Sequence, residues 1–399
     1  MKQWSRKKLI SSFLILTVHR FQLIRPSIFG KVIHHNLNQQ ILNNIDIPIL
    51  PLELQIKFAC FVQQNNKSKF VLYKQLLFIK KYDIMIPYKM NDSARYHLPG
   101  LFEFYELYKV FLPLWRMHRD WFYDWCDIGS IYGAPADCLW GGGRAGFGEA
   151  DAADVLALMN EYGISSRLTF SNSLLKAEHL ADKKCNDLCK MFSTVCQGPV
   201  VEALETTCVN NGVIVHSDLL AEYLRQNYPQ LYLVSSTTKV LTDFSDFEAE
   251  LNRPDFEYVV PDFRLNKEFS RLAALTQIQK DKVEFLCNEC CDFSCKNRRR
   301  CYENVSRKNM GEDVPDHKCA SPDAAGGYRF SLAMKNRAFI GIQDIQNTYL
   351  PMGFSNFKIE GRGLGSAVVL EFLLYYMTKP EHQLEVREAI YLDSMLDLF

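Results

Sequence analysis

The chain has 399 residues, of which 48% are hydrophobic and 23% are charged, and its formal net charge at pH 7 is zero. Its 13 cysteines are few for this length. That density argues against a small secreted disulfide scaffold and favours a reducing, cytoplasmic setting. The basic N-terminus precedes the apolar run FLILTV, which at about six residues is too short for a signal peptide core or a membrane span. We therefore expect a soluble protein with no membrane partner.

The zero net charge hides a division of the chain near residue 89. Residues 1–89 carry 14 Lys or Arg against 3 Asp or Glu, whereas the remaining residues carry 32 against 43. Only one of the 20 glycines and one of the 13 cysteines lie in this first segment. Such a shift in composition marks a domain boundary. The sequence predicts a small, mostly helical segment at 1–89 and a separate, larger domain at 90–399.

Within the first segment, residues 43–81 predict a short extended piece followed by a helix, with Pro51 in its first turn. The motif IPILPLELQ and the residues after it, about 35–81, resemble the C-terminal part of a type I restriction-modification specificity subunit. That resemblance implies a spacer helix that docks on a methylase subunit or binds DNA, although the positive charge fits a solvated helix equally well. Because almost nothing precedes it, the segment is predicted to be a specificity-subunit fragment, either functional or a fusion remnant.

The larger domain begins with the aromatic stretch 101–124, which predicts one or two helices closing the bottom of a barrel. From residue 125 onward, β-branched or aromatic runs alternate with helical patterns, as in a parallel sheet wound by helices. Two helices are well marked, one ending at Gly163 and one capped by Ser217 or Asp218. Eight strands over about 275 residues predict an α/β fold, a (β/α)8 barrel of the TIM type. The predicted strands are 125–133, 166–172, 212–218, 231–237, 256–262, 283–289, 338–344 and 354–361.

Active sites of this fold lie at the carboxyl ends of the strands, where this sequence places polar residues. We expect catalytic groups among His216, Asp218, Asp262, Glu289 and Glu360. Substrate-binding groups are expected among Arg144, Asn172, Arg264, Lys358 and Arg362. Some of these positions would serve only as caps and turns. The pair formed by His216 and Asp218 fits a general base with its orienting acid, and equally a hydrogen-bonded histidine at a strand end.

Two glycine-rich stretches follow the first and the last predicted strand. GGGR at 141–144 lacks the Lys-Ser/Thr end of a phosphate loop, so a flexible loop is predicted there, with Arg144 facing an anionic substrate. EGRGLGS at 360–366 runs into a predicted helix whose free amide groups suit an anion, or it forms the tight turn between strand and helix.

Two further stretches, EFLCNECCDFSC at 284–295 and FSNFKIEGRGLG at 354–365, resemble the collagenase-like peptidase family. The resemblance covers about 125–380. Relatives in that family include cytosolic proteins of ubiquinone, tRNA and rRNA hydroxylation, several with a [4Fe-4S] cluster on four cysteines. The family's late motif is matched by Lys358, Glu360, Gly361 and Arg362, and its first cysteine after the sixth strand by Cys291. The cysteine spacing after Cys291 departs from the usual pattern, which leaves the ligand set open and weakens the transfer of peptidase activity.

Five cysteines lie between residues 287 and 301, beside an arginine run that would lower thiol pKa values. Thiolates are preferred ligands of iron and of zinc, and four are enough for either. The predicted ligands are Cys291, Cys295, Cys301 and Cys319, with Cys290 in reserve. The sequence does not decide whether these cysteines hold a [4Fe-4S] cluster, hold a structural zinc or have no metal bound.

No nucleophile paired with a base is visible in the sequence, so peptide cleavage is less expected than a redox reaction. The resulting hypothesis is an iron-sulphur barrel enzyme that hydroxylates, or otherwise modifies by redox chemistry, an anionic or RNA-related substrate. A zinc-stabilised barrel without redox activity and a restriction-system specificity fragment are the alternatives.

Overall fold

The structure is a computed structural model that describes residues 93–143, 148–194, 209–319 and 327–395. The predictions for residues 1–89 and for Arg144 therefore lie outside the described residues. The barrel belongs to a unit that runs from Tyr88 to Phe399. None of the helices in the described ranges has the length and apolar character needed to cross a membrane.

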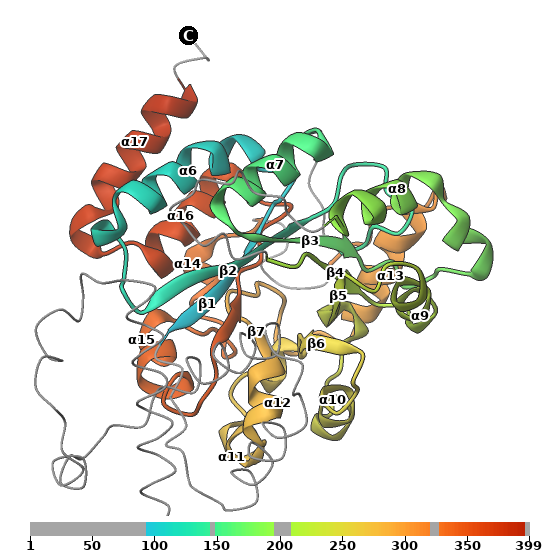
Figure 1. Cartoon of the computed structure of the whole chain (residues 1–399). Helices are drawn as coiled ribbons and strands as arrows, with labels where there is room; N and C mark the ends of the chain where they lie inside the picture. Colours follow the sequence, from blue (N-terminus) through green and yellow to red (C-terminus); the bar gives the residue numbers. More distant parts are fainter. Residues whose placement is uncertain (1–92, 144–147, 195–208, 320–326, 396–399) are drawn as a thin grey trace, which may run out of the picture. The chain divides into compact units, whose positions relative to one another are not determined.

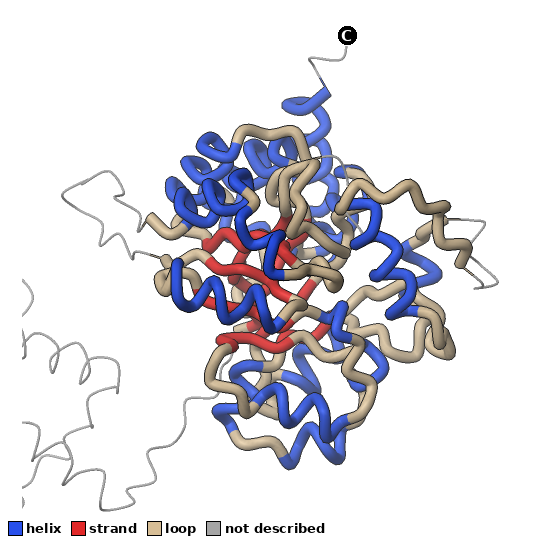
Figure 2. Tube along the Cα trace, turned by 90° about the vertical axis from the view of Figure 1, so that its right-hand side faces the viewer, coloured by secondary structure: helices blue, strands red, loops and turns tan. Residues whose placement is uncertain are grey.

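Eight parallel strands form a ring with helices around it, which confirms the predicted TIM-type α/β barrel (Figures 1 and 2). The strands follow one another in the order β6-β5-β4-β3-β2-β1-β8-β7. A parallel bridge between Val259 and Val283 joins the two ends and nearly closes the ring. The strands are β1 (Ala94–Pro99), β2 (Cys126–Gly133), β3 (Ser165–Phe170), β4 (Gly212–Val215), β5 (Tyr232–Ser235), β6 (Phe256–Val259), β7 (Glu284–Leu286) and β8 (Asn356–Lys358).

One predicted strand is wrong and one real strand was not predicted. Residues 338–341 form a loop that leads into the short helix α15 (Ile342–Asp344). The Ile340 amide of this loop donates a hydrogen bond to the carbonyl of Cys287, the residue that follows β7. No position in the ring is left for this segment, because β8 pairs with β7 on one side and β1 on the other. The missing member is β1, which pairs with both β2 and β8.

The two helices with clear end signals are confirmed. Helix α7 (Ala152–Tyr162) starts at an Asp151 cap and stops at Gly163, whose φ of 63° is readily accessible to glycine. Helix α9 (Asp218–Asn227) starts at Ser217, whose hydroxyl accepts a hydrogen bond from the amide of Leu220. The other α-helices are α6 (Tyr105–Met117), α8 (Lys183–Phe192), α10 (Phe244–Leu251), α11 (Phe269–Ala274), α12 (Gln277–Lys282), α13 (Arg298–Asn309), α14 (Phe330–Ala333), α16 (Ser366–Met377) and α17 (Gln383–Met395).

The aromatic stretch 101–124 forms α6 and a 3₁₀ turn at Arg119–Trp121. Helix α6 connects β1 to β2 and contacts α17. In the view of Figure 1, α6 is drawn next to α16. It buries one face, including Tyr108, Phe111 and Leu112, in the layer between the strands and the helices.

The barrel interior is partly apolar and partly charged. A small apolar cluster fills it toward the carboxyl ends of the strands, contributed by Tyr132, Ile214, Val234, Val260 and Leu286. The other inward-facing side chains include charged residues on β1, β3, β7 and β8, and the alternation of side chains along each strand places them inside.

Candidate metal centre at the barrel mouth

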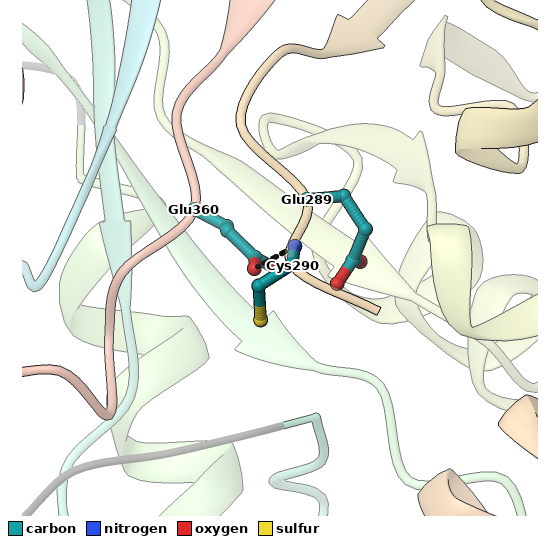
Figure 3. A group of neighbouring side chains, drawn as sticks. All are labelled: Glu289, Cys290 and Glu360. Atoms are coloured by element: carbon teal, nitrogen blue, oxygen red, sulfur yellow. Dashed lines mark hydrogen bonds between the residues drawn. The ribbon is translucent and has the colours of Figure 1, made fainter. Parts of the chain in front are cut away.

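Two carboxylates and one thiol meet where β7 and β8 end. One ligand atom each from Glu289, Cys290 and Glu360 lies within 4.8 Å of the others, and Figure 3 shows the three side chains converging. The side chain of Asn288 holds the two chain segments together. Its Oδ1 accepts from the Glu360 amide at 2.8 Å and its Nδ2 donates to the Glu360 carbonyl at 3.1 Å. The carboxyl ends of neighbouring strands thus bring residues 71 positions apart in sequence, Glu289 and Glu360, into one group.

The Glu289 carboxylate is fixed on both oxygens. Oε1 accepts a hydrogen bond from the Cys291 amide at 2.8 Å, and Oε2 lies 2.5 Å from an Arg298 guanidinium nitrogen. Arg298 comes from α13, is buried, and packs over the rings of Phe263 and Tyr302. A carboxylate oxygen has more than one lone pair, so these contacts leave capacity for a metal ion and orient the carboxylate toward it.

The same arginine also faces Asp262, which is fully buried. Arg298 Nε and Arg264 Nε each lie 3.5 Å from a carboxylate oxygen of Asp262. Burial raises the pKa of Asp262, and the two arginines act in the opposite direction. Asp262 is also the cap of the turn that follows β6, where its side chain accepts from the Arg264 amide. Of the predicted catalytic residues, Asp262 and Glu289 thus share one arginine.

The donor set suits a single divalent ion. Zinc takes Cys sulphur and Glu oxygen, and iron accepts the same donors, whereas a four-thiolate cluster needs thiols that this group does not supply. In the described parts of the chain, Cys291, Cys295, Cys301 and Cys319 do not form a group of three ligands within the same spacing. Cys290, the reserve ligand in the sequence, is the cysteine that joins the carboxylates.

The cysteine-rich loop is attached to the barrel mouth mainly through its backbone. Asn336 Nδ2 donates to the Cys291 carbonyl at 2.9 Å, and Arg264 donates to the Cys295 carbonyl at 2.9 Å. Arg264, predicted to bind substrate, thus contacts both Asp262 and this loop. Cys291, Cys295 and Cys301 are partly buried, and Cys319 is exposed. The cluster predicted on these thiols stays a prediction.

The predicted pair of His216 and Asp218 is split between different partners. His216 Nδ1 shares a hydrogen bond of 2.9 Å with the Thr238 hydroxyl, while Asp218 forms ion pairs with Lys239 and Arg253 at 3.3 and 2.7 Å. Burial lowers the pKa of His216 to about 4, helped by the positive charge of Lys239. The imidazole is therefore neutral near pH 7.

Asn172, which follows β3, uses its side chain for hydrogen bonds to the backbone of neighbouring loops. Its Nδ2 donates to the Leu139 carbonyl at 2.9 Å, and its Oδ1 accepts from the Leu174 amide at 2.9 Å. These contacts hold the loop after β2 against the end of β3.

A cavity of about 150 Å³ opens beside the group formed by Glu289, Cys290 and Glu360. Its floor is the apolar cluster of the barrel interior, and Glu360 is part of its wall. Hydroxyl groups line it from the ends of β3 and β5, at Thr169, Ser171, Ser236, Thr237 and Thr238. Two of the predicted substrate-binding residues, Lys358 and Arg362, line it as well.

Both of these cations have a buried carboxylate partner. Lys358 Nζ lies 3.1 Å from Glu284 and 3.4 Å from the centre of the Tyr132 ring. Burial lowers the pKa of Lys358 to about 8, although Glu284 counteracts this. Arg362 Nε donates to Glu103 at 2.7 Å, and its Nη1 donates to the Gly142 carbonyl at 3.3 Å.

The sequence prediction missed Glu103, Glu284 and Arg298 as parts of the site. Glu284 had a usable signal, because it alternates with Phe285 on a predicted strand and so faces the barrel interior. Arg298 was visible only as one arginine of a run, and Glu103 lies in a stretch that was predicted to be helical.

No family model and no curated protein matches the chain. A solved structure described as "The Structure of the U32 Peptidase Mk0906" is similar in fold, with 16% sequence identity and a TM-score of 0.41. The similarity covers 67% of this chain and 93% of that chain. A similarity this distant carries no argument about activity, so the functional argument depends on the residues of the barrel mouth.

Proposed function

We propose that the chain is a metal-dependent enzyme that holds one divalent ion on Glu289, Cys290 and Glu360 and acts on a small anionic substrate. The observation that carries this proposal is the convergence of the three ligand atoms within 4.8 Å, next to a cavity at the carboxyl ends of the strands. This is the end of the barrel where enzymes of this architecture have their active sites.

The charges around the group also favour a cation. Two carboxylates and a thiolate would carry three negative charges, and the Arg298 guanidinium beside Glu289 is shared with Asp262. A divalent ion would offset much of this charge and so reduce the repulsion between ligands held this close. When bound, such an ion supplies a Lewis acid that polarises a substrate carbonyl or activates water.

The residues of the chain have separate roles in this proposal. Arg298 orients Glu289, and the paired side chain of Asn288 fixes the backbone that carries Glu360. Cys290 supplies the thiolate. Lys358 and Arg362, each held by a buried carboxylate, place hydrogen-bond donors in the cavity wall, which suits an anionic substrate.

The identity of the metal decides the reaction class. Iron at this site would support the oxidative modification that the family resemblance implies, on an anionic or RNA-related substrate. Zinc would support hydrolysis, or a structural role without redox chemistry. Four irons per chain would instead favour the cluster predicted on Cys291, Cys295, Cys301 and Cys319.

Metal analysis of the full chain, purified without oxygen, tests the proposal. We expect about one zinc or iron per chain, as in a site with one ion. The variants Glu360→Gln and Cys290→Ser should lose it, whereas Cys319→Ser, a matched change of an exposed cysteine outside the group, should keep it. If the metal is retained by Cys290→Ser and lost by Cys319→Ser, the proposed ligand set is wrong.

A further inference from the structure

Two hydroxyl groups in the cavity wall are buried without a partner. The side chains are Thr169 on β3 and Ser171 just after it, exposed by 6% and 2%. No described residue makes a hydrogen bond with Thr169 Oγ1 or Ser171 Oγ. Burying an unpaired hydroxyl is unfavourable for folding, so two of them on one wall point to a ligand that completes their hydrogen bonds.

A glycine lies opposite one of these hydroxyls in the cavity wall. Gly143 also lines the cavity and has a φ of 74°, a conformation that other residues rarely adopt. A Cβ at this position would lie 3.8 Å from Ser171 Oγ. That distance is ordinary van der Waals contact, so glycine is favoured here by its backbone conformation and not by the space beside Ser171.

The two cations of the wall have donors to spare. The ammonium of Lys358 has three N–H groups; one donates to Glu284 and another is directed to the Tyr132 ring, so one is left. The guanidinium of Arg362 has five, and its bonds to Glu103 and to the Gly142 carbonyl use two. The carboxylate partners fix these side chains without exhausting them.

The combined donor set selects the chemistry of the ligand. Lys358 and Arg362 can only donate hydrogen bonds, and both hydroxyls are able to donate. Such a set matches an oxyanion, whose atoms are all acceptors. The cavity of about 150 Å³ has room for about five waters at roughly 30 Å³ each, which suits a small ion or a short organic acid.

We propose that Thr169, Ser171, Lys358 and Arg362 form a subsite for the oxyanion group, carboxylate or phosphate, of a small substrate. The inference rests on the proposed function, because it names the substrate class for the same barrel mouth. The anionic end of the substrate occupies this subsite, and Glu360 in the same wall places the metal centre next to the rest of the molecule.

Calorimetric titration of the full chain in EDTA tests the subsite independently of the metal. The probes are inorganic phosphate, malonate and malonamide, which is the neutral counterpart of malonate. We expect phosphate or malonate to bind and malonamide not to bind. The combined variant Thr169→Val, Ser171→Ala should weaken oxyanion binding by at least about tenfold, because the loss of even one hydrogen bond to a charged group has an effect of that size. The matched control is Ser173→Ala, whose hydroxyl pairs with Ser306 and does not line the cavity.

The outcomes separate the two proposals. A preference for phosphate or for malonate identifies the source of the oxyanion. The subsite is overturned if neither oxyanion binds the folded protein, if malonamide binds as tightly as malonate, or if the double variant keeps full affinity. Oxyanion binding by a chain that takes up no metal would refute the metal centre alone, and metal uptake without oxyanion binding would refute the subsite alone.

Discussion

Inside the barrel, the Glu284 carboxylate accepts a hydrogen bond of 2.5 Å from Arg167, and neither side chain reaches solvent. Lys358 and His97 approach the same carboxylate at 3.1 and 3.6 Å. Burial alone would raise the pKa of Glu284, but Arg167, His97 and Lys358 together hold it well below its usual range. Glu284 thus holds in place Lys358, one of the two cations of the proposed subsite.

Replacing that anion should destabilise the protein strongly. In Glu284→Gln, Arg167 and Lys358 lose their counterion inside the barrel, and breaking a buried ion pair in this way costs about 3–5 kcal/mol. The free energy of unfolding, measured with urea, checks this. The matched control is Glu257→Gln on β6, an exposed glutamate that should change stability by less than about 0.5 kcal/mol. Equal losses in the two variants would contradict the role of Glu284.

The sequence predicted the elements whose hydrophobic pattern matches the burial of their side chains in the fold. The short strand β4 is a wholly buried apolar run, as expected of a parallel sheet, and the capped helices begin and end near their signals. Strand β1 was missed because it carries Arg95 and His97, residue types that are seldom expected in a strand of a parallel barrel buried on both faces. His97 is buried against Ser130, 33 positions away, and against Glu284 on β7, and no local pattern reveals partners that distant.

The sequence predicted that the site lies at the carboxyl ends of the strands, but it did not predict which residues form the ligand group. Glu289, Glu360 and Arg362 all lie at the mouth, because the carboxyl ends of parallel strands share one edge. Cysteine spacing could not show that Cys290 meets two carboxylates, since the path of the loop after β7 depends on contacts with Asn336 and other distant residues. Adjacency in sequence also misled the interpretation of His216 and Asp218, because their side chains have different partners.

His216 should make stability depend on pH in the acid range. Burial lowers its pKa to about 4, with Lys239 and Arg299 acting in the same direction and Asp218 against it. Between pH 6.5 and 4 the unfolded chain binds a proton that the folded chain does not, so the free energy of unfolding falls as the pH falls. The full shift corresponds to about 3 kcal/mol, and we expect about 1–2 kcal/mol because solvent screens a half-buried side chain.

Urea unfolding of wild type and His216→Asn at a series of pH values measures this contribution. The variant lacks the titrating ring, so its stability should decline less between pH 6.5 and 4, while the slope from other groups is common to both proteins. Parallel curves would show that His216 does not contribute to acid sensitivity.

Alkylation should separate the cysteines by exposure and by metal binding. With iodoacetamide, Cys290 and Cys319 should react first because both are exposed. Cys126 and Cys287 should resist, since both are buried and burial raises the pKa of Cys126 to about 12 and that of Cys287 well above its usual range. Zinc should protect Cys290 and leave Cys319 reactive, as measured by mass spectrometry of peptides. Protection of Cys319 together with Cys291 would favour the four-cysteine cluster instead.

Arg298 should control metal affinity although it binds no metal itself. Its planar guanidinium lies 2.5 Å from Glu289 and 3.5 Å from Asp262. A lysine ammonium cannot contact both carboxylates in this planar arrangement. In Arg298→Lys the orientation of Glu289 is lost while the charge is kept, so zinc affinity should fall about 10- to 100-fold in a competition titration with a chelating dye. The matched control is Arg300→Lys, an exposed arginine on the same helix, which should keep wild-type affinity. An unchanged affinity in a folded Arg298→Lys protein would mean that Glu289 needs no orienting partner.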